Sequence, residues 1–337
     1  MKKQKIITYL LIASFILLVI NIVVDKIVKQ LPKEPEKTDL TPGEISERFE
    51  NVVREFGIDK DWIKSKTPKE KTSVSDISSF EIRIPQGLPV AVVLNELNRT
   101  FLDENVTLTS KETTKGKITT LKILSNKNIM LQADFIPDAT LTRKTANLGF
   151  IIDDIDKISD KKVDEILSLP ESFAFSLVPS DRSEKLKQKI LASSKEYVVL
   201  FNDDIDEVRF KLSPDYNDKR LKGSIRNILG SFSESKLYII DEKSDLFKSS
   251  VNAILEKDFD ARKLKLFPMN SFVTVKGKNE QDLQSLFSYY CQSSNSSGNK
   301  VFLISADDFI ELKSVLETFR KRGYRFVFPS SLKFGVM

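Results

Sequence analysis

Two adjacent aspartates, Asp153 and Asp154, follow the apolar run 147–152 and are the residues whose type and spacing best suit chemistry. An apolar run that ends in this way predicts a buried strand, and the carboxyl ends of parallel strands are where reacting groups are placed. Neighbouring carboxylates can bind a hard cation, hold a cationic ligand or raise each other's pKa for acid–base work. The pair is therefore either a working site or the remains of one.

Further acidic residues follow later apolar runs of the same kind. They are Asp203, Asp204, Asp241 and Asp307. If these runs are parallel strands, their ends share one rim with Asp153. Asp307 also has a structural interpretation, because acids that open a helix cap its free N–H groups and meet the positive end of its dipole.

Composition removes several classes of function. The chain contains no histidine, which excludes mechanisms that need imidazole as base, acid or metal ligand. Its single cysteine, Cys291, excludes an intrachain disulfide and leaves the redox compartment open. The 53 basic and 48 acidic residues are spread along the chain and leave a net charge of +5, which argues against a nucleic-acid partner.

From residue 148 onward, short apolar runs alternate strictly with amphipathic segments. The runs are 148–153, 173–179, 197–202, 236–241, 263–268, 301–305 and 325–330. Apolar strands joined by amphipathic helices predict parallel pairing, with helices covering the sheet. We therefore expect an α/β fold over residues 147–337, a seven-stranded (β/α) barrel that is closed or nearly closed.

Residues 79–146 have a different pattern, in which a strand and a helix precede three strands of a meander. This predicts a small α+β domain without identifiable chemistry. Residues 31–78 are expected to be a tether, with a polar loop at 65–78. The tether contains a short amphipathic helix that begins near Thr41 and packs against the next domain.

Residues 1–30 predict a membrane anchor. The stretch from Ile6 to Val24 is apolar or small and polar throughout, and it is long enough to cross a bilayer as a helix. Lysines ahead of it predict a single-pass protein of the cytoplasmic (inner) membrane, with a cytoplasmic N-terminus and the bulk of the chain periplasmic or extracellular. A cleaved signal peptide is the alternative, and the length of the stretch and the lack of a small-residue cleavage site argue against it.

Several motifs carry a family resemblance. "LGFIIDDID" at 148–156, followed by "LPESFAFSLVPS" at 169–180, resembles the opening of the divergent polysaccharide deacetylases. "YIIDEKS" and the closing "RGYRFVFPSSL" are similar to later family segments, so the resemblance covers residues 82–332. It implies an extracytoplasmic seven-stranded deacetylase barrel, with Asp153 at the position of the general base and Asp154 at that of the metal-ligating carboxylate.

The chain departs from this family at its histidines. Phe201 and Ile228 stand at two histidine positions of the family, although Asn227 keeps the asparagine of the second motif, and residues 305–307 replace a late Gly-His-Pro. In the family reaction, a divalent metal held by two imidazoles and a carboxylate polarises the acetamide and activates water. One remaining carboxylate cannot retain zinc, so we expect no cofactor and a remnant base at Asp153. The expected substrate-binding residues are Asp154, Asp203, Asp204, Asn227, Asp241 and Asp307.

Three functions stay open at this point. The first is a membrane-anchored deacetylase-like protein of cell-envelope carbohydrate metabolism that binds glycan without catalysis. The second is an active deacetylase, hydrolysing a C–N amide bond, with an oxygen-only Ca²⁺, Mg²⁺ or Mn²⁺ site. That site would be built from Asp154, Asp241 and either Asp203 or Asp204. The third is an assembly or scaffold protein whose partner is another envelope protein.

Overall fold

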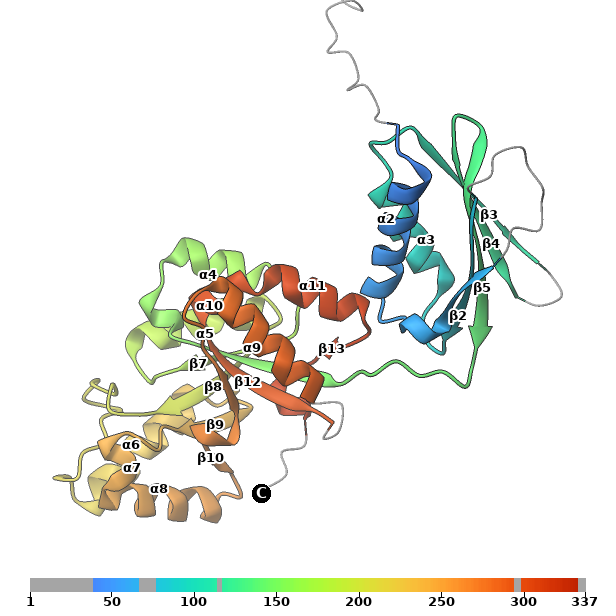
Figure 1. Cartoon of the computed structure of the whole chain (residues 1–337). Helices are drawn as coiled ribbons and strands as arrows, with labels where there is room; N and C mark the ends of the chain where they lie inside the picture. Colours follow the sequence, from blue (N-terminus) through green and yellow to red (C-terminus); the bar gives the residue numbers. More distant parts are fainter. Residues whose placement is uncertain (1–38, 67–76, 114–116, 294–297, 333–337) are drawn as a thin grey trace, which may run out of the picture.

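The computed structural model describes residues 39–66, 77–113, 117–293 and 298–332, which form two α/β domains connected by residues 139–146 (Figure 1). The predicted membrane span, Ile6 to Val24, lies outside the described residues. Among the helices that are described, none combines the length and the apolar character that crossing a bilayer requires.

The small domain begins with helix α2 (Pro42–Glu55). Thr41 caps it, since its hydroxyl accepts the Glu44 N–H while the Glu44 carboxylate accepts the Thr41 N–H at 2.8 Å. The apolar face of α2 is buried in the core of the small domain, with Phe49 stacked on Phe80 of the sheet. The prediction that this amphipathic helix packs against the next domain is confirmed.

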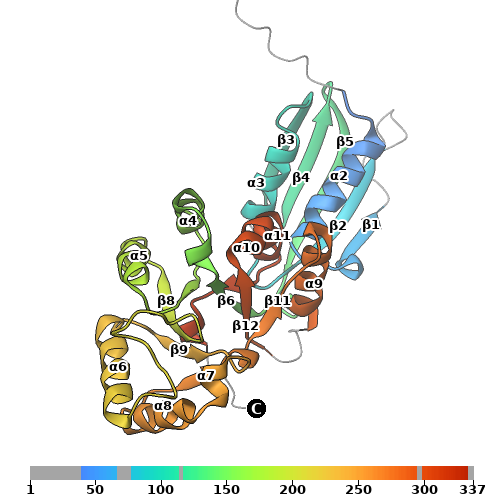
Figure 2. The ribbon, with the colours of Figure 1, turned by 90° about the vertical axis from the view of Figure 1, so that its left-hand side faces the viewer.

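The sheet of the small domain has five strands in the order β1-β2-β5-β4-β3, and helices α2 and α3 cover one of its faces (Figure 2). Its elements are β1 (Ile63–Lys66), β2 (Ser78–Pro85), α3 (Val90–Thr100), β3 (Val106–Glu112), β4 (Thr119–Ser125) and β5 (Asn128–Asp138). The predicted strand, helix and meander are present. Residues 65–66 were expected in a loop and instead end edge strand β1, where Lys66 pairs with Glu81 of β2 at 2.5 Å.

The second domain is built on a curled sheet in which every described pairing is parallel. Its strands are β6 (Asn147–Asp153), β7 (Ala174–Leu177), β8 (Glu196–Phe201), β9 (Leu237–Ile240), β10 (Leu266–Pro268), β11 (Val273–Val275), β12 (Lys300–Ser305) and β13 (Arg325–Phe326). Seven strands follow the order β10-β9-β8-β7-β6-β12-β11, and β13 pairs with the start of β6. The parallel α/β prediction is confirmed.

The predicted barrel is confirmed as a curled parallel half-barrel, and its number of strands is corrected. The sheet is a half-barrel, because β10 and β11 form its two ends and no described pairing joins them. Strand β11 was not among the expected strands, because its three residues pair with β12 and are too few to form an apolar run of their own. The number of strands is therefore eight, with β13 off the main path.

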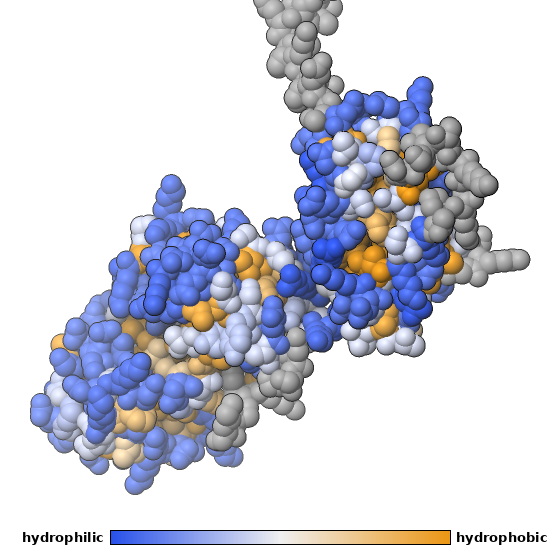
Figure 3. Space-filling view, viewed as in Figure 1, coloured by the Kyte–Doolittle hydropathy of each residue, from blue (hydrophilic) through white to orange (hydrophobic). Residues whose placement is uncertain are grey.

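Helices cover the convex face of the half-barrel. They are α4 (Asp160–Leu167), α5 (Asp181–Ala192), α6 (Asp218–Ser231), α7 (Asp245–Lys248), α8 (Ser250–Ala261), α9 (Glu280–Ser293), α10 (Ala306–Glu311) and α11 (Lys313–Lys321). Their outer surface is largely hydrophilic (Figure 3), and their apolar sides meet the sheet around residues such as Phe150. Strand pleating turns the next residue, Ile151, to the concave face, where a second core fills the inside.

Charged groups join the two domains. Lys321 at the end of α11 forms ion pairs with Glu55 of α2 at 2.9 Å and with Glu96 of α3 at 2.8 Å. Arg143 in the connecting segment donates to the carbonyl of Phe56 at 3.3 Å and to that of Lys321 at 3.1 Å. The first domain is thus fastened to the last helix of the second.

Candidate functional site

A cleft of about 700 Å³ opens where β6, β9, β11 and β12 end, at the carboxyl edge of the curled sheet. This is the edge at which parallel α/β folds place their sites. The charged residues that line it are Asp153, Asp154, Asp241, Glu242, Asp308, Lys243 and Lys276. Apolar residues form its wall, among them Met269, Phe272, Val275 and Leu303.

Asp153 is the last residue of β6 and is half-buried at the cleft. Ser176 of neighbouring β7 donates its hydroxyl hydrogen to the Asp153 carboxylate. Burial raises the pKa of Asp153 above its ordinary value, and the charge of Asp154 acts in the same direction, while the Ser176 hydrogen bond opposes both. The cleft therefore favours the protonated form of Asp153 more than water does.

Asp154 has different interactions from Asp153. Its backbone is left-handed, with φ of 58°, and it starts a short 3-10 helix, η2 (Ile155–Lys157). Its carboxylate pairs with Lys157 Nζ at 2.7 Å, and its carbonyl accepts the Lys157 N–H at 3.0 Å. The hydrogen bond to Asp154 raises the pKa of Lys157. Asp154 thus lines the rim with its charge already compensated.

Asp241 and Asp308 complete the acidic side of the cleft. Asp241 follows β9, and its carboxylate accepts the backbone N–H of Lys243 at 2.9 Å. Asp308 lies in the first turn of α10, after Ser305, whose hydroxyl caps the helix. Asp307 was the acid expected here, but its side chain is exposed and pairs with Lys162 of α4 at 2.7 Å. Successive residues of a helix point in different directions, so the cleft receives Asp308.

Asp203 and Asp204, both predicted to bind substrate, do not line the cleft. The Asp203 carboxylate accepts the backbone N–H groups of Asp245 and Leu246, both at 2.8 Å, and so caps α7. Asp204 accepts a hydrogen bond from Asn202 at 3.0 Å. Both acids therefore organise the loop and the short helix beside the site.

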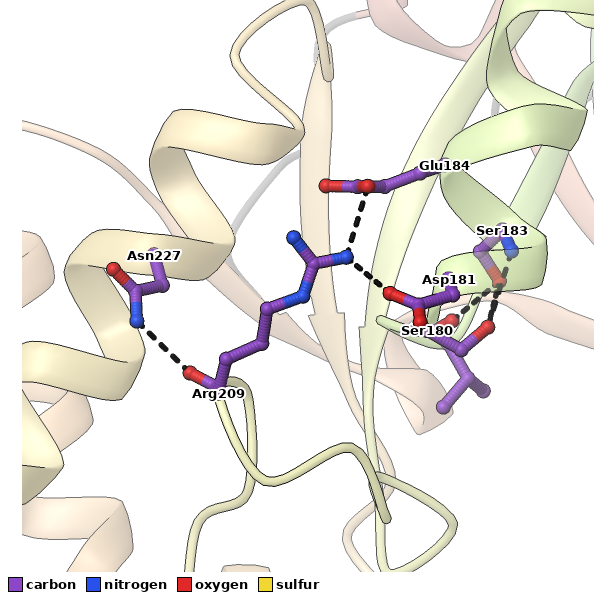
Figure 4. A network of polar contacts seen from close by, with 7 residues as sticks. Ser180, Asp181, Ser183, Glu184, Arg209 and Asn227 are labelled. Atoms are coloured by element: carbon purple, nitrogen blue, oxygen red, sulfur yellow. Dashed lines mark hydrogen bonds and ion pairs between the residues drawn. The ribbon is translucent and has the colours of Figure 1, made fainter.

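Asn227, the remaining predicted binding residue, also lies outside the cleft. Its side-chain amide on α6 donates to the carbonyl of Arg209 at 3.1 Å (Figure 4). The Arg209 guanidinium pairs with Glu184 of α5 at 2.9 Å and with Asp181. Asn227 therefore helps to fasten the long loop after β8 to two helices.

Phe201 and Ile228, which the resemblance places at histidine positions, both lie in the core beneath the helices with no exposed surface. The Phe201 ring packs edge-on against Phe259 of α8, with centroids 5.7 Å apart. Its neighbour Leu200 faces the concave side. Neither Phe201 nor Ile228 thus borders the cleft.

The residues present do not fit the metal that the resemblance implies. Within the described ranges, no three carboxylate or thiol side chains converge closely enough to hold a metal ion. Asp154 is paired with Lys157 and Asp203 caps α7, so the oxygen-only set is not assembled. We derive no reaction step through a metal.

One wall of the cleft was not predicted. Residues 269–276, comprising η3 (Met269–Ser271) and β11, supply Asn270, Thr274 and Lys276 beside the apolar wall residues. The β-branched residues in "FVTV" are a weak strand signal that could have pointed to this segment.

No protein-family model and no curated protein matches this chain. Similar solved structures include an uncharacterized Agrobacterium tumefaciens protein, at 12% identity and TM-score 0.40 over 57% of this chain and 90% of that one. A Bdellovibrio bacteriovorus peptidoglycan deacetylase follows, at 12% identity and TM-score 0.36 over 56% of this chain and 53% of that one. A Bacillus anthracis CE4 family pseudoenzyme has 12% identity and TM-score 0.36 over 71% of this chain and 94% of that one.

Polysaccharide deacetylases and a pseudoenzyme of the CE4 family are thus among the solved structures to which this chain is similar. The predicted likeness to polysaccharide deacetylases is confirmed to that extent. At these identities and TM-scores, the likeness carries no argument about activity.

Proposed function

We propose that this chain is a polysaccharide deacetylase-like protein that binds a cell-envelope glycan in its cleft without turning it over. The cleft itself is the observation that carries the proposal, because about 700 Å³ at the carboxyl edge of the sheet accommodates a short oligosaccharide. Its carboxylates, including that of Asp241, accept hydrogen bonds from sugar hydroxyls. Its apolar wall includes the partly exposed Met269, which offers surface to the apolar face of a sugar ring.

The lack of turnover rests on the chemistry of the available donors. The resembled reaction uses two imidazoles and a carboxylate to hold its metal, and the chain has no histidine. Asp154 has its charge compensated by Lys157. Asp153 then has no metal-activated water to deprotonate, and its carboxylate accepts the Ser176 hydroxyl instead.

A binding and turnover experiment tests both parts. The full chain is titrated calorimetrically with oligosaccharides of N-acetylglucosamine, with Asp241→Ala as the cleft variant and Asp206→Ala as the control. Asp206 is 88% exposed and lies outside the cleft, so only the cleft variant is expected to lose binding. Acetate release is measured with Zn²⁺, Ca²⁺, Mg²⁺ and Mn²⁺ added separately. Metal-dependent release that Asp153→Asn abolishes would refute the proposal.

The proposed location follows from the N-terminal sequence. The stretch from Ile6 to Val24 anchors the chain in the cytoplasmic membrane, and the lysines before it keep the N-terminus cytoplasmic. Both domains then lie in the periplasm or outside the cell, where envelope glycans are found. A reporter that matures only after export, fused after Met337, is expected to be active. Activity of a cytoplasm-only reporter at the same position would reverse this orientation.

A further inference from the structure

Acidic groups outnumber basic ones in the cleft, with five carboxylates against two lysines. Lys157 compensates Asp154, but no ion pair involves Asp153, Asp241 or Asp308 among the described residues. A concave site lined mainly by one sign of charge concentrates ligands of the opposite sign. The cleft therefore offers a negative potential that the protein itself does not neutralise.

The depth of these groups strengthens the asymmetry. Asp153, Asp241, Glu242 and Asp308 are half-buried, whereas Lys243 and Lys276 are exposed at the rim. Exposed ammonium groups are hydrated and screened by salt, so they offset a recessed carboxylate only weakly. A ligand that enters the cleft meets the carboxylates after it has passed the lysines.

The curl of the sheet brings these acids to one place. Asp241 follows β9 and Asp308 follows β12, and three strands separate β9 from β12 in the sheet. Both residues nevertheless line the same cleft because the sheet bends around it. The partly exposed Met269 lines the same cleft, so the site combines apolar surface with recessed negative charge.

We propose that the glycan bound here carries free amino groups, a de-N-acetylated amino sugar whose ammonium lies against Asp241 and Asp308. This inference rests on the proposed glycan-binding function and specifies its ligand class. An N-acetylated sugar presents a neutral acetamide and leaves the recessed carboxylates uncompensated, whereas an ammonium makes charge-assisted hydrogen bonds with them.

Two matched probes test the inference on the full chain, a β-1,4-linked glucosamine trimer and its fully N-acetylated counterpart. Both are titrated calorimetrically at low and high salt. We expect the glucosamine trimer to bind about tenfold tighter at low salt, as one charge-assisted contact would give. The preference is expected to shrink at high salt, because screening weakens the attraction between charges.

Variants of equal charge change locate the effect. Asp241→Asn and Asp308→Asn are each expected to remove most of the preference for the glucosamine trimer, measured within each variant as the ratio of the affinities for the two trimers. Asp206→Asn removes the same charge from an exposed loop outside the cleft and is expected to keep the preference. Far-UV circular dichroism verifies that each variant is folded.

The outcomes separate the two claims. Equal binding of both trimers, or tighter binding of the acetylated one, would overturn the inference and leave the proposed function standing. Binding of neither trimer would contradict the proposed function together with the inference. Spermidine provides a further control, since binding of this sugar-free polyamine as tightly as the glucosamine trimer would show attraction of any cation and overturn the inference.

Discussion

Restoring histidines at Phe201 and Ile228 is expected to unfold the second domain rather than to create a zinc site. The family resemblance aligns these positions with metal ligands, but both side chains are completely buried beneath the helices. An imidazole at either position would face apolar neighbours such as Phe259 and would not reach Asp153 across the sheet. The double variant Phe201→His/Ile228→His therefore tests where these side chains lie.

The expected loss of folding stability follows from the burial of both side chains. Replacing the Phe201 ring forfeits apolar burial worth about 1.5–3 kcal/mol. The edge-on contact with Phe259 adds about 0.5–1.5 kcal/mol. Ring nitrogens without partners cost about a further 1–3 kcal/mol. Phe201→His is thus expected to cost about 3–7 kcal/mol. Loss of the buried Ile228 side chain adds about 2–5 kcal/mol, so the pair consumes most of a typical domain stability of about 5–15 kcal/mol.

The assay must distinguish unfolding of the second domain from unfolding of the small domain. Trp62, the single tryptophan, lies in the small domain, so its fluorescence follows that domain during urea unfolding. Near-ultraviolet circular dichroism of tyrosines such as Tyr197 and Tyr238 follows the second domain. Val208→His is the control, because it adds an imidazole to a side chain that is 72% exposed and should cost little. A double variant with native stability and one bound zinc per chain would refute the buried placement.

Three further predictions concern stability. Burial raises the pKa of Asp153 in the native state, so between the ordinary aspartate pKa and this raised pKa the native state holds a proton that the unfolded chain has lost. The free energy of unfolding should therefore fall as pH rises through that interval. Asp153→Asn should flatten that fall and raise the urea midpoint at neutral pH, and an unchanged pH profile would contradict this. Lys321→Met removes both ion pairs to the small domain and should cost about 1–2 kcal/mol, with faster proteolysis between the domains; unchanged cleavage would count against the link. Gly323→Ala should cost about 1–2 kcal/mol, since the φ of 98° suits glycine and an added Cβ would meet Arg143 at 2.9 Å. An unaltered thermal midpoint would show that Arg143 moves and relieves the clash.

The strands of the second domain were predictable because they are buried on both faces. Each residue of β7 and β9 is buried, and such strands appear in a sequence as short continuous apolar runs. β11 left only the weak signal of its β-branched residues, because its three residues become a strand mainly through pairing with β12. Whether the sheet closes could not be predicted from the sequence either, because the pairing of β10 with another strand depends on the curl of the whole sheet.

The candidate site was predictable only where a side chain ends a strand or directly follows one. Asp153 and Asp241 do so, and the structure places both at the cleft. Asp203 also follows a strand, but its carboxylate accepts the N–H groups at the start of α7, a helix that begins more than forty positions later in the chain. The local sequence around Asp203 contains no sign of this long-range partner.

The acidic strand ends therefore have two different causes. Helix starts and lysines account for three of the acids, since Asp203 caps α7, Asp154 pairs with Lys157, and Asp307 pairs with Lys162. These interactions fix the loops around the rim and would be needed whether or not the cleft binds anything. Asp153 and Asp241 have no such ionic partner among the described residues and face the cleft. The adjacent pair at the end of β6 is thus divided in role, because both residues line the cleft but only Asp153 lacks an ionic partner among the described residues.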